Sequence, residues 1–485
     1  MNEMGHEGNG ARQLPSRAET SLKQRIYRVS RIPRAMISRC RRYIGYLNLS
    51  WALLVVRVLQ LPKPGMDGPW AVSKISYVLY NSLPYASAGY ATRGHSVAVA
   101  IRKLGYDLEL VTRPGFPIDL KETPIDSVIP TLSDIDGVPY VRLTEPSKRG
   151  LDNFSYIIRS AAALENHFRR SKPDLVIAAS NFLNAIPSLL AARRAGIPFI
   201  YEVRGMWEIT RQSRDPSYGD TIEFKVYRFL ETLACRYADL VLTLTGPMRD
   251  DLISRGIDPC RIKLVPNSCN VEAFQPRARD NVLAESLGIP SAIPVIGYVG
   301  SFVQYEGLDD LARACAELKR RGIQFRLLLV GKEKTADGEP GPITSSIVDT
   351  AEAGGYAEWL VMPGRVNHEE VSTYYSLIDI APFPRKAQLV TELVSPLKPL
   401  EAMGMSKAVI VSSVRAMAEM VQDGETGLIF QKGNVEDLAD KLASLVQGPD
   451  LRAKLGQNAR DWVARKRTWE GTWLAVLEKS CPLKN

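Results

Sequence analysis

The chain has 485 residues, 45% of them hydrophobic, and this length excludes a single ordinary core, since such cores stop growing at about 250 to 300 residues. The formal net charge is +9, and the six cysteines form no CxxC or Cys/His cluster with zinc spacing. We therefore expect two domains in a reducing, cytoplasmic setting and no structural metal.

The first predicted segment, residues 1–70, is a basic extension. Residues 12–42 contain ten Lys or Arg against one acidic residue, and residues 43–62 are more apolar but interrupted by Asn48, Ser50 and Arg57. A membrane-spanning helix needs about 20 mainly apolar residues, so an interfacial helix on the anionic inner face of the cell membrane is more suitable. A disordered tail followed by a helix packed on the protein is the equal alternative. Nucleic acid is a weaker third interpretation because no recognition motif is present, and the first residues lack the apolar run of a secretory signal.

Short apolar runs alternate with amphipathic stretches from Ser73 onward, which predicts a parallel sheet covered by helices on both faces. Strands are predicted at 74–80, 107–113, 174–180, 198–203 and 239–245, and helices at 184–196 and 247–256. The Pro- and Asn-containing residues 263–280 are typical of a linker. The first domain is expected over residues 71–280.

The alternation restarts after the linker and predicts a second Rossmann-like domain over residues 281–465. Its strands are expected at 295–301, 325–331, 359–366, 378–384, 408–413 and 427–430. Residues 461–480 are predicted to form one helical segment. The C-terminal part of the chain, residues 466–485, is expected to cross back to the first domain. Open parallel sheets bind ligands beyond the carboxyl ends of their strands, so a site in a cleft between two facing domains is predicted.

The segment TELVSPLKPLEAMGM, residues 391–405, predicts an anion site. Ser395 is expected to cap a helix whose first turn holds Pro396, which would leave free N–H groups for an anion. Lys398 is unfavourable at a helix start unless an anion offsets its charge, and Glu401 has two oxygens suited to the two hydroxyls of a ribose. The alternative is that Lys398 and Glu401 form an ion pair within the helix, which would stabilise the helix by about 0.2 to 0.5 kcal/mol.

Other motifs carry weaker signals. Gly300 and Gly307 flank a strand-to-helix loop where a phosphate could approach, although plain turn glycines are as common there. The pair Asp134 and Asp136 resembles a DxD metal motif but precedes a Gly-Val-Pro turn, so a hairpin is expected instead. His95 could line a cleft or cap a helix. Trp207 and Glu208 follow a predicted strand and could meet an acceptor or simply pack.

At these residues the chain resembles the retaining glycosyltransferases of family 4, which have the GT-B fold. The matching motifs are GSFVQYEG at 300–307, PGRV at 363–366 and Glu401-Ala402-Met403. SPLKPLEAM, YEVRGMWE and SLPYASAGYATRGH are similar to a bacterial branch associated with polysaccharide and exosortase gene systems. The resemblance spans residues from about 73 to the C-terminus.

The resemblance implies three groups of site residues. The expected catalytic residues are Arg204, Lys398 and Glu392; the donor-binding residues are Gly300, Ser301, Arg365, Val366, Arg385, Ser395, Pro396, Leu397, Lys398 and Glu401; the acceptor-side residues are Gly89, Tyr90, Arg93, Trp207 and Glu208. No metal ligand and no cofactor is expected.

The sequence also departs from the family pattern. Ser301 and Glu306 stand where many members have the cations that grip the donor diphosphate, Glu392 lies nine rather than eight residues before Glu401, and Arg204 replaces a cleft histidine. Phosphate charge must then be met by Lys398, Arg385 or Arg365.

The implied activity is metal-independent transfer of a sugar, with retention, from a nucleoside diphosphate donor to a glycan or lipid-linked glycan acceptor in bacterial surface polysaccharide synthesis. UDP is the favoured nucleotide because it is the usual one in the donors of this family. The alternatives are a nucleotide-sugar epimerase of the same fold and a non-catalytic scaffold that binds nucleotide sugar and membrane. A dehydrogenase is disfavoured because GYVGSFVQYEG is not GxGxxG.

Overall fold

The computed structural model describes residues 69–120, 123–124, 127–333, 335 and 340–484. The predicted basic extension and its membrane contact fall on residues 1–70 and so lie almost wholly outside the described residues. Within the described ranges, no helix is both long enough and apolar enough to cross a bilayer.

The N-terminal domain is built on an eight-stranded sheet in the order β3-β4-β2-β1-β5-β6-β7-β8. All neighbours pair in parallel except β3 and β4, which form an antiparallel hairpin. Continuous apolar runs such as LVIAA in β5 are fully buried because helices cover both faces of a parallel sheet. The strands are β1 Lys74–Leu79, β2 Asp107–Thr112, β3 Leu132–Ile135, β4 Val138–Arg142, β5 Leu175–Ala179, β6 Phe199–Val203, β7 Leu240–Thr243 and β8 Ile262–Leu264.

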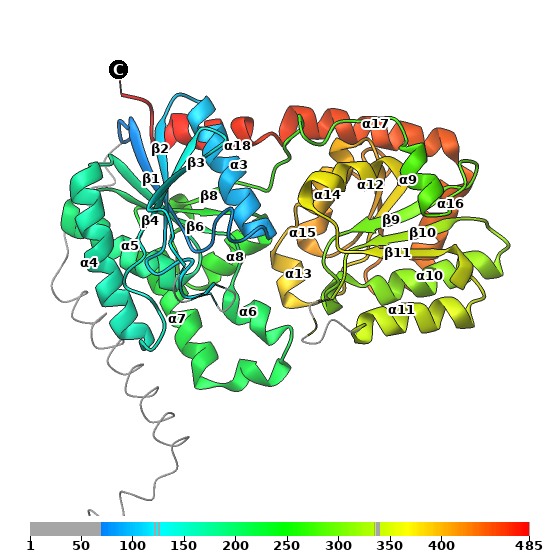
Figure 1. Ribbon diagram of the computed structural model, residues 1–485, viewed down its shortest axis with the longest axis horizontal. Helices are drawn as coiled ribbons and strands as arrows, with labels where there is room; N and C mark the ends of the chain where they lie inside the picture. The colour runs from blue at the N-terminus through cyan, green and yellow to red at the C-terminus, as the bar shows by residue number, and fades with distance from the viewer. Residues whose placement is uncertain (1–68, 121–122, 125–126, 334, 336–339, 485) are drawn as a thin grey trace, which may run out of the picture. The chain divides into compact units, whose positions relative to one another are not determined.

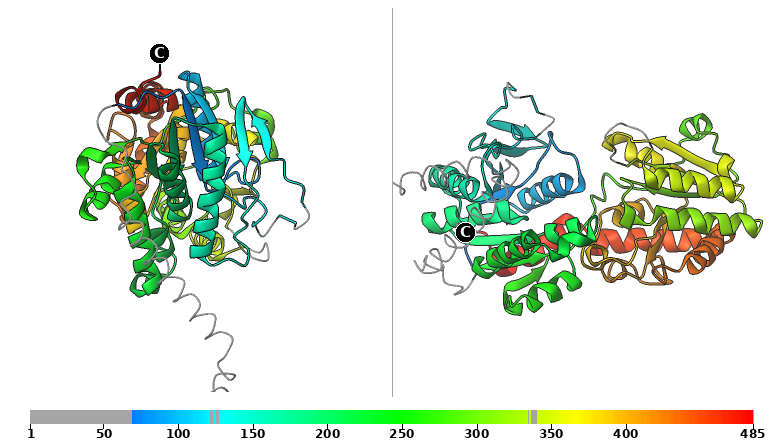
Figure 2. Two further views of the ribbon diagram at one scale, coloured as in Figure 1. Left: turned by 90° about the vertical axis from the view of Figure 1, so that its left-hand side faces the viewer. Right: turned by 90° about the horizontal axis from the view of Figure 1, so that it is seen from below.

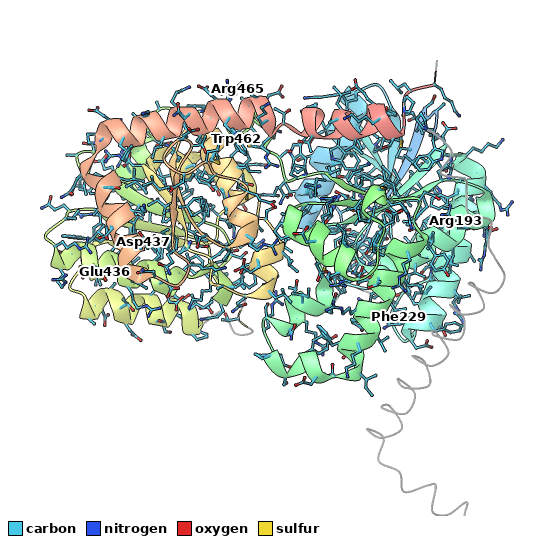
Figure 3. All side chains as sticks on the ribbon, turned by 180° about the vertical axis from the view of Figure 1, so that it is seen from behind. Arg193, Phe229, Glu436, Asp437, Trp462 and Arg465 are labelled. Carbon is cyan, nitrogen blue, oxygen red and sulfur yellow. The ribbon has the colours of Figure 1, made fainter. Side chains whose placement is uncertain are left out.

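The helices of this domain follow the predicted alternation with the strands. They are α3 Gly89–Lys103, α4 Asn153–Ser171, α5 Phe182–Ala195, α6 Trp207–Gln212, α7 Ile222–Tyr237 and α8 Gly246–Ser254, with the short 3-10 helices η1 Pro216–Asp220 and η2 Pro259–Arg261. A buried ion pair ties α5 to β7: Arg193, labelled in Figure 3, donates from both terminal nitrogens to Asp239 at 2.8 and 2.9 Å. Asp239 also accepts from the Phe199 N–H at 2.8 Å, so both of its oxygens are satisfied in the interior.

The C-terminal domain contains a six-stranded parallel sheet in the order β11-β10-β9-β12-β13-β14. Strands β10 and β11 are added on one side of β9, whereas β12, β13 and β14 are added on its other side. In a parallel sheet, a ligand site is expected beyond the carboxyl ends of the strands where the order changes side, which here is between β9 and β12. The strands are β9 Val295–Val299, β10 Arg326–Val330, β11 Leu360–Gly364, β12 Ile380–Phe383, β13 Ala408–Ser412 and β14 Leu428–Phe430.

Helices flank this second sheet (Figure 1), with α10 packed against α11 and α16, and α14 packed against α17. They are α9 Asn281–Ser286, α10 Leu308–Arg320, α11 Pro342–Ala353, α12 Val371–Leu377, α13 Leu389–Leu393, α14 Lys398–Gly404, α15 Arg415–Ala418, α16 Val435–Gln447 and α17 Pro449–Lys466, with η3 Gln304–Glu306, η4 Ala357–Trp359 and η5 His368–Glu370.

The C-terminal segment is two helices rather than the single helix predicted over 461–480. Helix α17 ends at Lys466, and α18, Trp469–Ser480, begins after Thr468, whose hydroxyl accepts from the Gly471 N–H at 3.2 Å. A Thr that caps a new helix has extended backbone and so interrupts the old one. Helix α18 lies beside α3 (Figure 1), and its Trp473 and Leu477 belong to the core of the first sheet. Burial of a side chain such as Leu477 contributes about 1.5 to 3 kcal/mol.

The end of the chain is also held to this domain. Val72, just before β1, forms a parallel bridge with Leu483, and both views in Figure 2 place the C-terminus over the N-terminal domain. The prediction of an α/β protein with two Rossmann-like domains is confirmed, and all eleven predicted strands are present in the described residues.

Candidate active site

The loop after β9 is packed tightly against two later segments of the C-terminal domain. Gly300 has φ +150°, and a Cβ there would overlap Cε of Lys398. Gly307 has φ +74°, and a Cβ there would overlap the carbonyl oxygen of Pro384. Glycine is required at both positions, because a side chain would be strained and would displace its neighbour. The loop is thereby brought against the residues that follow β12 and against the start of α14.

Three charged side chains meet at this junction. The Glu306 carboxylate is buried and accepts from Arg385 Nη2 at 2.8 Å and from Nε at 3.2 Å. Lys398 Nζ donates to the same Glu306 Oε1 at 3.3 Å. Burial raises the pKa of Glu306, but the charges of Arg385 and Lys398 outweigh burial and lower it to about 2. Glu306 is therefore ionised at any physiological pH.

The two cations differ in their accessibility. Arg385 is 7% exposed, and its remaining nitrogen Nη1 donates to the Val394 carbonyl at 3.0 Å, so internal partners occupy the guanidinium. The Lys398 side chain is 22% exposed, and its ammonium also donates to the Tyr298 hydroxyl at 2.5 Å. Lys398 is thus the better placed of the two to meet a ligand anion.

Glu401 lies one turn after Lys398 in α14 but does not pair with it. In the part of the chain that the structure describes, no ion pair joins these two residues and no side-chain hydrogen bond reaches the Glu401 carboxylate. Burial raises the pKa of Glu401 to about 7, while the charge of Lys398 acts in the opposite direction. The intrahelical pair is absent, and a carboxylate with unused acceptor capacity stands at this position.

The predicted helix start at Ser395 is wrong. Helix α14 begins at Lys398 with Leu397 as N-cap, and Pro399 lies in its first turn. Had the helix begun at Pro396, Pro399 would occupy the fourth helical position, where its missing N–H breaks a required hydrogen bond. Ser395 is instead buried between α13 and α14, outside regular secondary structure, and its carbonyl accepts from Asn267 Nδ2 at 2.7 Å.

Three other predicted donor residues lie just beyond β9 and β11, which are separated by β10 in the sheet, and Leu397 is the N-cap of α14. Ser301 is exposed directly after β9, Arg365 is exposed after β11, and Val366 packs against the core of this domain. Leu397 packs against the core of the N-terminal domain. Glu392 in α13 accepts from the Arg415 N–H at 2.8 Å and from Lys432 Nζ at 2.6 Å, so its carboxylate is already engaged.

A second charged cluster lies at the carboxyl end of β6 in the N-terminal domain. Arg204 is 6% exposed and donates from Nε to Glu202 at 3.0 Å, from Nη1 to the Tyr90 carbonyl at 2.9 Å and from Nη2 to the Tyr77 hydroxyl. Arg93 donates to the other oxygen of Glu202 at 2.8 Å. The guanidinium of Arg204 is thus fully engaged by protein groups, and its catalytic role stays a prediction.

The remaining acceptor-side residues differ in accessibility. Trp207 is 40% exposed and meets the edge of the Tyr80 ring at a centroid distance of 5.0 Å. Gly89 is exposed at the start of α3. Glu208, by contrast, is buried and accepts from Arg255 Nη1 at 2.9 Å, so only Trp207 of this pair presents its side chain to solvent.

The DxD-like residues form the expected hairpin turn. Asp136 and Gly137 both have positive φ between β3 and β4, and the Gly137 N–H donates to Asp134 Oδ1 at 2.9 Å. Asp136 Oδ2 lies 3.0 Å from His95 Nε2. His95 lies inside α3 rather than at its start, so the capping role considered for it is wrong.

Sequence reasoning missed three residues of these clusters. In the sequence, Glu306 stands out only as a departure from the family pattern, and nothing there indicates a role for Tyr298 or Asn267. Asn267 accepts from Arg93 Nη1 at 2.6 Å and donates to Ser395, so it connects the two charged regions. No spacing pattern in the sequence identifies them, because their partners lie far away along the chain: Lys398 is 92 residues from Glu306, and Arg93 is 174 residues from Asn267.

Comparisons with known proteins cover both domains. Residues 88–268 match the model of the glycosyl transferase 4-like domain, and residues 281–462 match that of glycosyl transferases group 1. The chain is 26% identical over 389 residues to the D-inositol 3-phosphate glycosyltransferase of Rhodococcus erythropolis, covering 79% of this chain and 83% of that protein.

Solved structures with the same fold include a sucrose-phosphate synthase and the HepE protein of Anabaena. The sucrose-phosphate synthase of Thermosynechococcus elongatus aligns with a TM-score of 0.64 at 19% identity, covering 84% of this chain and 98% of the other. Anabaena Alr3699/HepE in complex with UDP aligns with a TM-score of 0.64 at 15% identity, with the same coverages. At these identities the likeness concerns the fold alone.

Proposed function

Because the chain belongs to the family 4 glycosyltransferases of the GT-B fold, we propose that it transfers a sugar from a nucleoside diphosphate sugar to an acceptor hydroxyl. The observation that carries this proposal is that Lys398 and Glu401 lie within the first turn of α14 without pairing with each other. One is a partly exposed ammonium held by Tyr298 and Glu306, and the other is a carboxylate without a side-chain hydrogen-bond partner among the described residues.

In this proposal Lys398 meets the diphosphate and Glu401 accepts from the two ribose hydroxyls. The ammonium would stabilise the charge that develops on the leaving diphosphate, which is electrostatic catalysis by a preorganised group. UDP is the favoured nucleotide, because the HepE structure of the same fold is a complex with UDP. Gly300 keeps the approach to Lys398 free of side-chain atoms.

We place the reaction in the retaining class. The bond between the anomeric carbon and the diphosphate oxygen breaks, and the bond to the acceptor oxygen forms on the same face of the sugar. The acceptor proton passes to the departing phosphate, so no separate protein base is required. Arg204 and Glu392, both engaged by neighbouring groups, would then act by holding the shape of the site.

The reaction is proposed to need no divalent metal. The DxD-like carboxylates are part of a turn, where Asp134 accepts from Gly137 and Asp136 lies against His95. Among the described residues, no group of three or more His, Cys, Asp or Glu side chains is arranged to hold a metal ion. Lys398 would supply the positive charge at the diphosphate instead.

The acceptor is proposed to be a bacterial surface glycan or its lipid-linked precursor. The exposed Trp207, in edge contact with Tyr80, offers an apolar ring face of the kind that packs on sugars. The basic residues 12–42 suggest that the acceptor is met at an anionic membrane. Vesicle flotation of the full chain and of a variant lacking residues 1–65 tests this part separately, and equal flotation at all salt concentrations would contradict it.

A thermal-shift screen across UDP-, GDP-, ADP- and dTDP-sugars tests the proposed function. A ligand at 100 times its dissociation constant stabilises the folded protein by about 2.7 kcal/mol, which is readily measured. We expect one nucleotide class to raise the melting temperature and the matching sugar to be transferred with retained anomeric configuration, seen by NMR. Failure of every nucleoside diphosphate and nucleotide sugar to stabilise the protein would refute the donor site.

A further inference from the structure

Glu306 occupies an unusual place for an acidic residue in a site meant for a diphosphate. Its Oε1 accepts from both Arg385 at 2.8 Å and Lys398 at 3.3 Å. The Glu306 side chain is 4% exposed, whereas that of Lys398 is 22% exposed, so the carboxylate contacts the ammonium from the interior. The exposed part of Lys398 is left for a ligand.

We propose that Glu306 is a positioning residue of the donor site: it holds Lys398 and Arg385 in place as an internal counter-ion and thereby limits how tightly a nucleoside diphosphate binds. This inference rests on the proposed function, since it assigns Glu306 a part in the same site. It is a positioning rather than a catalytic role because Glu306 acts through the two cations.

The contacts around Glu306 show how the position of each cation is fixed. Arg385 is bound by both carboxylate oxygens and by the Val394 carbonyl, which leaves its guanidinium one orientation. Lys398 has two fixed acceptors, Glu306 and Tyr298, and its stem passes where any Cβ on Gly300 would lie. Loss of the carboxylate would leave these two cations side by side.

The charge of the cluster sets the direction of the effect. Arg385 and Lys398 contribute two positive charges and Glu306 one negative charge, so the three together carry +1. Replacing the carboxylate by an amide would raise this to +2 and leave a buried guanidinium without its counter-ion, which destabilises the free protein. A bound diphosphate relieves that repulsion, so the anion should bind more tightly when Glu306 is neutral.

The test is calorimetric titration of Glu306→Gln with UDP and with uridine. UDP should bind about tenfold more tightly than to the unchanged protein, since one charge-assisted interaction is worth about that factor, while uridine affinity should stay within about twofold. Glu317→Gln is the matched control, because Glu317 also pairs with two cations, Arg320 and Arg321, but on the exposed surface of α10. It should leave both affinities unchanged.

A double variant keeps the inference testable if Glu306→Gln does not fold. Glu306→Gln with Arg385→Gln removes the buried pair together, retains a cluster charge of +1, and should bind UDP within about threefold of the unchanged protein. Folded Glu306→Gln that binds UDP no more tightly, or a more than tenfold loss in the double variant, would overturn the inference. If the unchanged protein binds no nucleoside diphosphate, the proposed function fails instead, which is a different result.

Discussion

Replacement of Lys398 by alanine should weaken the binding of UDP but not of uridine. The ammonium donates to Tyr298 at 2.5 Å and to Glu306 at 3.3 Å, which holds it in one place before any ligand arrives. Two unit charges 4 Å apart interact by about 4 kcal/mol at an effective dielectric constant of 20, and desolvation reduces the net value for a hydrogen bond to a charged group to about 1.5 to 3 kcal/mol. The expected loss of UDP affinity is therefore about ten- to a hundredfold.

The structure indicates that this variant will fold. Glu306 keeps its two-pronged contact with Arg385 when Lys398 is removed, so no buried carboxylate loses its only partner. Isothermal titration with UDP and uridine measures the difference directly. Lys319→Ala is the control, because this lysine on α10 stacks on Trp359 at 3.6 Å from the ring centroid and should not affect either ligand. Equal losses for UDP and uridine, or no loss in a folded variant, would refute the assignment of Lys398 to the diphosphate.

Four further predictions concern the titration of Glu401, the packing at Gly300 and the metal requirement. Because burial raises the pKa of Glu401 to about 7, uridine affinity should increase as pH rises from about 6 to 8, and Glu401→Gln should weaken uridine and remove that pH dependence. The same raised pKa means that the folded protein binds the proton more strongly than the unfolded chain, so chemical denaturation should show stability falling from about pH 4.5 to pH 7 and less so in Glu401→Gln. Gly300→Ala should weaken UDP binding by displacing the Lys398 ammonium, and an unchanged titration would contradict this. EDTA should leave sugar transfer unchanged; activity lost with EDTA and restored by manganese would reopen Asp134 and Asp136.

The fold could be predicted from the sequence because apolar runs in a parallel sheet are buried on both faces. The run VIGYV at 295–299 is fully buried as β9, and the turn at Asp136–Gly137 follows from residues that tolerate positive φ. The start of α14 was misplaced because two prolines, Pro396 and Pro399, could each occupy a first helical turn. The spacing of the two prolines decides between them, because a helix that began at Pro396 would be interrupted at Pro399.

The partners of buried charges could not be predicted, because they depend on three-dimensional approach rather than spacing. The sequence places Lys398 three residues from Glu401, yet its ammonium pairs with Glu306, 92 residues earlier in the chain. Glu208 next to the exposed Trp207 likewise turns inward to Arg255. Neighbouring residues on a loop or a short helix can have opposite environments, and periodicity over so few residues does not distinguish them.

A crystal structure of the protein with UDP tests the account most directly. We predict the β-phosphate within hydrogen-bond distance of Lys398 Nζ, the ribose hydroxyls on the Glu401 carboxylate, and Glu306 still bound to Arg385 on the interior side. A nucleotide bound elsewhere, or a diphosphate at this site that does not contact Lys398, would contradict it.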